Sequence, residues 1–130
     1  MLLIAIKNLH PDQEKIILEL NGDTERPICH FELAASNYRE KKPDIEAKYN
    51  IVEFESLGTK VKNTKRFYVI NPTSLAYDFE WKRINEDKGS NPGFFRCVTQ
   101  RGTILSGKKS EMIFEYTPDL IGTHESYWVF

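Results

Sequence analysis

Alternating side chains between turns marked by glycine and proline constrain the fold of this chain more than any other feature. Within residues 111–117, Met112, Phe114 and Tyr116 lie on one parity, so in a strand they would share one face. Pro118 ends this segment, and Gly122 turns the chain into a second apolar segment, residues 124–130. The pattern predicts consecutive antiparallel strands that bury one face each, as in a β-sandwich.

Similar short segments recur through the C-terminal two thirds of the chain. Residues 51–57, 60–71, 77–81, 94–98 and 102–105 are rich in β-branched and aromatic residues, and turn signals separate them at intervals of about ten residues. No alternation of strands with helices is visible, and no short repeat period is present. We therefore expect an all-β, immunoglobulin-like sandwich.

The same alternation predicts the core of this sandwich. In residues 51–57, for example, Val52 and Phe54 share one face, and Glu53 and Glu55 share the other. The residues expected on the buried faces are Val52, Phe54, Phe67, Val69, Tyr77, Phe79, Trp81, Met112, Phe114, Tyr116 and Trp128.

The N-terminal third has a different character. Residues 2–9 and 15–20 are predicted strands, although residues 12–20 also fit a short helix, and residues 27–35 form another extended segment. Residues 36–50 are highly charged, contain one proline and have few apolar residues, as expected of a linker. We expect residues 1–35 to be the last strands of a preceding module, residues 36–49 a linker, and residues 50–130 the sandwich.

Both ends lie inside apolar runs. The opening run stops at Lys7, too short for a secretory core or a membrane span, so an intracellular location is expected. The run at 127–130 indicates a piece of a larger protein, with a sandwich that lacks its last strand.

Two cysteines, Cys29 and Cys97, stand 68 residues apart. This spacing is compatible with a disulfide between sheets, but without a secretory signal two unbonded thiols are favoured, one in each expected module.

The sequence offers no catalytic, cofactor-binding or metal-binding set. Eighteen basic and nineteen acidic residues nearly balance, which argues against a nucleic-acid partner. His10, His30 and His124 are scattered, and Gly107-Lys108-Lys109 lacks the glycine spacing and following helix of a phosphate loop. We expect no enzyme activity, no cofactor and no small-molecule substrate.

The order of several short motifs resembles a known family. Asn71-Pro72 closes one strand, an aromatic strand ends in Trp81, Gly102 to Gly107 forms a G-x-I-x-x-G turn, and residues 114–118 lead to Gly122. This order is similar to the ASH domain, a PapD-like and major-sperm-protein-like module, in the form found in Hydin-like proteins.

The resemblance implies a structural role. Hydin-like proteins belong to the central pair apparatus of motile cilia and flagella, where such modules would contact other axonemal proteins or neighbouring modules of the same chain. The alternative is a recruiter of short peptide motifs at a membrane or cytoskeletal surface, as in the relatives of major sperm protein, although no matching basic surface is evident.

Overall fold

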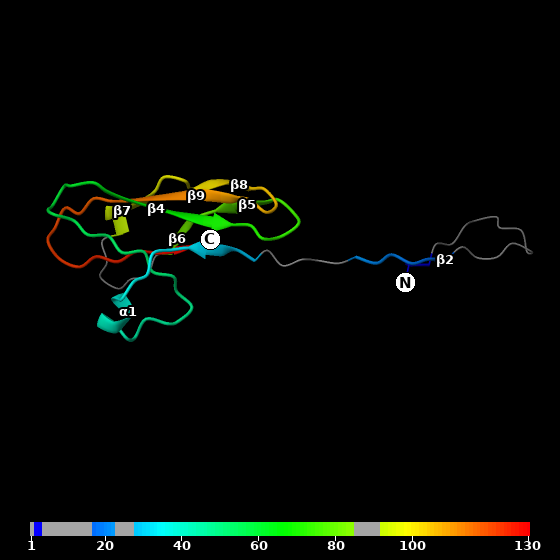
Figure 1. The fold of residues 1–130 in the computed structure, drawn as a ribbon, viewed down its shortest axis with the longest axis horizontal. Helices are drawn as coiled ribbons and strands as arrows, with labels where there is room; N and C mark the ends of the chain where they lie inside the picture. The colour runs from blue at the N-terminus through cyan, green and yellow to red at the C-terminus, as the bar shows by residue number, and fades with distance from the viewer. Residues whose placement is uncertain (1, 4–16, 23–27, 85–91) are drawn as a thin grey trace, which may run out of the picture.

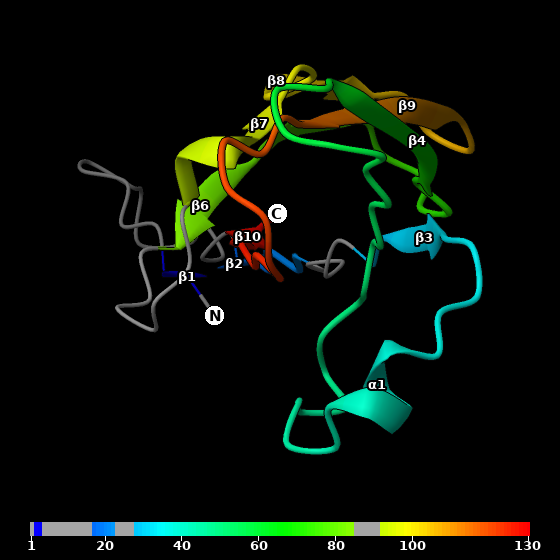
Figure 2. The ribbon, with the colours of Figure 1, turned by 90° about the vertical axis from the view of Figure 1, so that its left-hand side faces the viewer.

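The computed structural model describes residues 2–3, 17–22, 28–84 and 92–130, and it is an antiparallel all-β fold. The larger sheet has the order β3 (His30–Glu32), β4 (Asn63–Ile70), β9 (Lys109–Tyr116), β7 (Phe95–Cys97). Its central pair, β4 and β9, aligns over eight residue pairs from Asn63 opposite Tyr116 to Ile70 opposite Lys109. The short 3-10 helix η1 (Pro92–Phe94) precedes β7. The two long strands, β4 and β9, lie side by side in both views (Figures 1 and 2).

A second layer contains two strand pairs. β5 (Tyr77–Glu80) pairs with β8 (Arg101–Ile104), and β6 (Lys82–Ile84) pairs with β10 (Tyr127–Val129). Only Trp81 separates β5 from β6, and its amide donates to the carbonyl of Gln100 at 2.8 Å. In Figure 2, β10 lies across the molecule from β4 and β9. The predicted all-β sandwich is therefore confirmed.

Trp81 is the centre of the core between these layers. Its ring meets those of Phe31, Phe67, Phe114 and Phe130 at centroid distances of 4.8–6.2 Å. Its indole N–H donates to the sulfur of Met112 at 3.3 Å, so the one polar atom of this buried ring has a partner.

Most residues expected in the core lie there. Seven are buried: Phe67, Val69, Phe79, Trp81, Met112, Phe114 and Tyr116. Three more are half-buried and pack on the core: Phe54, Tyr77 and Trp128. Val52 does not fit the expectation, because its side chain is 37% exposed. Residues 51–57 form no strand, so no sheet divides their side chains into a buried and an exposed face.

The asparagine of the Asn-Pro turn joins two loops. The side chain of Asn71, fully buried, donates to the carbonyls of Leu75 and Ile104 and accepts from the amide of Thr73. Its backbone carbonyl accepts from the amide of Gly107, which has a positive φ of 66°. One side chain thereby fixes the turn after β4 against the turn before β9.

The boundary expected after residue 35 differs from the structure. β3 pairs with β4 within the larger sheet, with His30 opposite Ile70, and Cys29, Phe31 and Leu33 pack on the core. Residues 28–33 are thus part of the sandwich. β9 pairs with one edge of β4, and β3 covers the other edge, which would otherwise be unpaired. α1 (Tyr38–Lys41) lies within the expected linker.

The two cysteines are unbonded, as expected, but they do not lie in separate modules. Cys29 and Cys97 belong to the same sandwich; Cys97 is buried, and Cys29 packs on the core.

Farther toward the N-terminus, β1 (Leu2–Leu3) pairs with β2 (Ile17–Leu18). Residues 17–18 are thus a strand rather than a helix, while the other residues of the two expected strands up to residue 16 lie outside the described part. Figure 1 places β2 beyond one end of the sandwich. No helix among the described residues is long and apolar enough to cross a membrane.

Candidate interaction site

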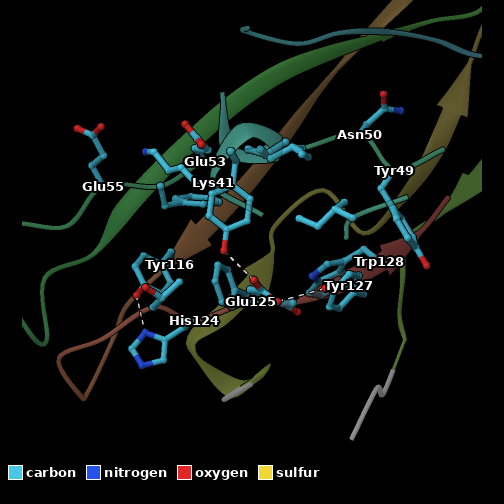
Figure 3. Close-up of a pocket in the computed structure, with 18 of the residues that line it drawn as sticks. Lys41, Tyr49, Asn50, Glu53, Glu55, Tyr116, His124, Glu125, Tyr127 and Trp128 are labelled. Carbon is cyan, nitrogen blue, oxygen red and sulfur yellow. Dashed lines mark hydrogen bonds between the residues drawn. The ribbon is translucent and has the colours of Figure 1, made fainter. Parts of the chain in front are cut away.

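A cavity of about 370 Å³ lies between the segment that follows α1 and the segment that leads into β10. Residues 49–55 line one side, and residues 122–128 line the other. Figure 3 shows Glu53, Glu55 and Tyr49 on the first side, and His124, Glu125 and Tyr127 on the second. Its volume falls within the range of about 300–1,000 Å³ that is typical of ligand pockets.

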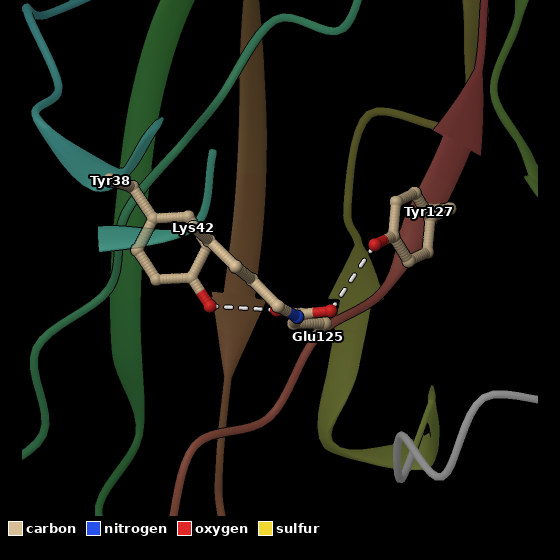
Figure 4. Close-up of polar contacts among 4 residues, drawn as sticks. All are labelled: Tyr38, Lys42, Glu125 and Tyr127. Carbon is tan, nitrogen blue, oxygen red and sulfur yellow. Dashed lines mark hydrogen bonds and ion pairs between the residues drawn. The ribbon is translucent and has the colours of Figure 1, made fainter. Parts of the chain in front are cut away.

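Glu125 ties the two sides together. Its carboxylate accepts hydrogen bonds from the hydroxyls of Tyr38, at 2.7 Å, and Tyr127, at 3.2 Å, and it forms an ion pair with Lys42 (Figure 4). Residues on α1, next to it and on β10 therefore meet at one carboxylate. This contact fixes the linker segment against the sandwich.

These contacts also set the charge states of the cluster. Burial by itself raises the pKa of the Glu125 carboxyl, but the hydrogen bonds from Lys42, Tyr38 and Tyr127 outweigh it, and the pKa is lowered. The hydrogen bond to Glu125 raises the pKa of both Tyr38 and Lys42. The ion pair is therefore present at neutral pH, and the tyrosine keeps its proton.

Aromatic rings build one wall of the cavity. Phe54 meets Phe95 and Tyr116 at centroid distances of 5.9 and 5.7 Å, which fixes residues 51–55 against β7 and β9. The hydroxyl of Tyr116 lies 2.8 Å from Nδ1 of His124, whose ring also stands edge-on to Phe94. Burial raises the pKa of Tyr116, so its hydroxyl is protonated and available as a donor.

Several polar groups at the cavity are unused. Within the part of the chain that the structure describes, the buried hydroxyl of Ser126 has no hydrogen-bond partner. Glu53 and Glu55 have neither an ion pair nor a hydrogen bond among the described residues, whereas Glu125 has Lys42 and Glu115 has Lys62. Lys41 also lines the cavity. Among the described residues, the rim thus carries the two unpaired carboxylates of Glu53 and Glu55 and the ammonium group of Lys41.

The sequence did not point to this site. Tyr38 and Lys42 precede Glu125 by 87 and 83 residues, and no local motif marks contacts at such separations. Of the three histidines, His124 lies in the cavity wall, His30 is exposed on β3, and His10 lies outside the described residues. Among the described residues, no group of three or more His, Cys, Asp or Glu side chains is placed to hold a metal ion.

Comparison with known proteins gives two curated relatives. The chain is 33% identical over 99% of its length to the human protein "Hydrocephalus-inducing protein homolog" and 31% identical over 99% of its length to the mouse "Hydrocephalus-inducing protein". In each case it spans about 3% of the relative's length. No family model matches the chain, and no solved structure matches it significantly.

Proposed function

We infer, from the premise that this chain is a Hydin-like domain, that it is a non-catalytic structural module of a ciliary protein. The observation that carries this proposal is the match over 99% of the chain to one short segment of hydrocephalus-inducing protein. Because the match covers about 3% of this relative, the corresponding segment there is the size of one domain within a much longer protein, as expected of a structural module.

The fold supports this proposal. Each of the two layers has edge strands among the described residues, such as β3 and β7 in the larger sheet, and strand edges are natural points of contact with other chains. The resemblance of the Asn71-Pro72 and Gly102–Gly107 motifs to ASH and PapD-like modules indicates the same role. We place the domain in the axoneme, at the central pair apparatus, where it supports ciliary motility.

The partners in this proposal are other axonemal proteins or neighbouring modules of the same polypeptide. The surface is suited to specific rather than purely electrostatic contacts, because basic and acidic residues nearly cancel, with a net charge of −1. Strand edges and local pockets, rather than a uniformly charged face, would then determine what the domain binds.

Capture from demembranated motile axonemes tests this function. The purified 130-residue chain is immobilised, and bound proteins are identified by mass spectrometry. The variant Trp81→Ala, which is expected to disrupt the core, serves as the control. Enrichment of central-pair proteins on the wild-type chain alone is the expected result. Binding of acidic-tract peptides in a parallel arm, with no enrichment of axonemal proteins, would contradict the proposal and indicate the peptide recruiter instead.

A further inference from the structure

On both sides of the cavity, the backbone forms no pairing with any other described part of the chain. Residues 50–57 contain no helix or strand, and within the described part of the chain they form no backbone-to-backbone hydrogen bond. The same holds for residues 119–126 across the cavity. Backbone amides and carbonyls pair wherever the fold allows, so two facing unpaired segments indicate a place where a strand can be added.

Side chains hold both segments in position without using their backbones. Phe54 is packed between Phe95 and Tyr116, and Glu125 is held by Tyr38 and Lys42. Figure 2 shows the stretch between α1 and β4 running up the molecule from α1 toward the top, where β4 pairs with β9. A partner strand would therefore meet a preformed site and would not have to order it.

The edge of the second layer leads into the same cavity. β10 has β6 as its strand neighbour within the described residues, and its Tyr127 and Trp128 line the cavity. A strand added beside β10 would continue this layer toward residues 50–57, and its inward side chains would face Phe54, Phe95 and Trp128.

Charge indicates the chemistry of the occupant. Glu53 and Glu55 both line the cavity, and neither carboxylate has a partner among the described residues. Lys42, by contrast, is taken by Glu125. An apolar floor with two free carboxylates at its rim fits a strand with apolar residues at alternate positions and basic residues between them.

We propose that an extended partner peptide of this kind, apolar at alternate positions and carrying Lys or Arg between them, binds in the cavity. It pairs through its backbone with residues 50–57, beside β10. The inference rests on the proposed protein-contact role, for which it names the binding surface and the chemical class of the partner.

A titration of the full chain with synthetic peptides tests this assignment. The probe alternates valine and lysine; one control peptide replaces lysine with glutamate, and another carries N-methyl groups on alternate amides. Binding is followed by NMR shifts and by hydrogen exchange at the amides of residues 50–57. The Val/Lys peptide should slow exchange there, whereas the N-methylated peptide should bind far more weakly because it lacks backbone donors.

Two variants separate charge recognition from folding. Glu53→Gln with Glu55→Gln should weaken binding of the Val/Lys peptide about two- to thirtyfold, since each of the two surface pairs contributes roughly 0.2–1 kcal/mol. Glu111→Gln is the matched control, because Glu111 pairs with Arg66 between β9 and β4, and it should leave binding unchanged.

Several outcomes would overturn the proposal. They are no binding at millimolar peptide, equal binding of the N-methylated peptide, or no effect of the double variant. If dimerisation of the free chain protects the same amides, the cavity would be assigned to a second copy. If these amides are protected in the free monomer and deletion of residues 1–22 removes that protection, the cavity would be assigned to the chain's own N-terminal segment. The axonemal capture experiment tests the proposed function separately. A failed peptide titration would therefore contradict the binding site proposed here without contradicting that function.

Discussion

Three residues of this domain each connect elements that lie far apart in the sequence. Trp81 connects both layers of the core, Asn71 joins two turns, and Glu125 joins the linker segment to β10. Alternation in the sequence is enough to predict that Trp81 is buried, because burial follows from strand parity. The role of Glu125 cannot be predicted in this way, since its partners lie more than 80 residues away.

Removing a core ring should unfold the domain or come close to it. Trp81→Ala and Phe114→Ala should each lower the free energy of unfolding by about 3–5 kcal/mol, through lost burial and a new cavity. Thermal denaturation followed by circular dichroism measures this. Leu57→Ala, at a fully exposed position, is the control and should melt like the wild type; a Trp81→Ala curve that matched it would contradict the placement of this ring.

The Glu125 cluster predicts a specific pH dependence. In the folded state the pKa of the Glu125 carboxyl lies below the ordinary value of 4.5. As the pH falls, this carboxyl therefore takes up a proton in the unfolded chain before it does so in the folded chain. The stabilisation from this carboxylate is therefore complete well above pH 4.5 and is lost as the pH falls through the lowered pKa. Glu125→Gln should be less stable than the wild type by about 1 kcal/mol at pH 7.

Denaturant titrations of both proteins at pH 7 and pH 3 check this sign. The difference in the free energy of unfolding between the wild type and Glu125→Gln should shrink toward zero at pH 3. A gap that stays constant or widens would show that the carboxylate does not stabilise the fold through its charge.

At the scale of elements, the paired strands are the part that the sequence predicts well. β9 shows strict alternation and forms all eight pairs with β4. Two predictions fail for different reasons. Residues 27–35 are predicted to be extended, as β3 is, but they are assigned to a preceding module because the long-range pairing of β3 with β4 leaves no local signal. Residues 51–57 have strand-like alternation but form no strand, because among the described residues no strand pairs with them. Local pattern indicates strand character, whereas pairing depends on what lies beside it.

Truncation separates the strands at the N-terminal end. Deleting residues 1–22 removes β1 and β2, which pair with each other, and should change the free energy of unfolding by less than about 1 kcal/mol. Deleting residues 1–35 also removes β3 and Phe31, and should cost at least the 3–5 kcal/mol typical of a lost core aromatic residue.

Urea denaturation of both truncated chains beside the full chain gives these values. Equal stability of the two truncated chains would contradict the assignment of β3 to the sandwich. A large loss on removing residues 1–22 alone would show that β1 and β2 support the sandwich as well.

At the scale of the whole molecule, the sandwich has one closed region and one open region. β3, β4, β9 and β7 form a continuous sheet over an aromatic core, whereas the opposite side ends in the cavity between residues 50–57 and 119–126. This asymmetry fits a structural module, because a stable sheet carries the fold while the open region remains available for contact. The basic, strand-like partner proposed above would bind in this open region, where the described residues leave backbone groups and two carboxylates unpaired.

Native-state hydrogen exchange of the free monomer, resolved by residue, tests this division most directly. The amides of β4 and β9 should be the slowest to exchange, with those of β3 close behind. The amides of residues 50–57 and 119–126 should exchange orders of magnitude faster, because neither segment forms a backbone hydrogen bond with the rest of the described chain. Slow exchange throughout residues 50–57 in the free monomer would contradict the account, since it would mean that this segment is already paired and that the region is closed.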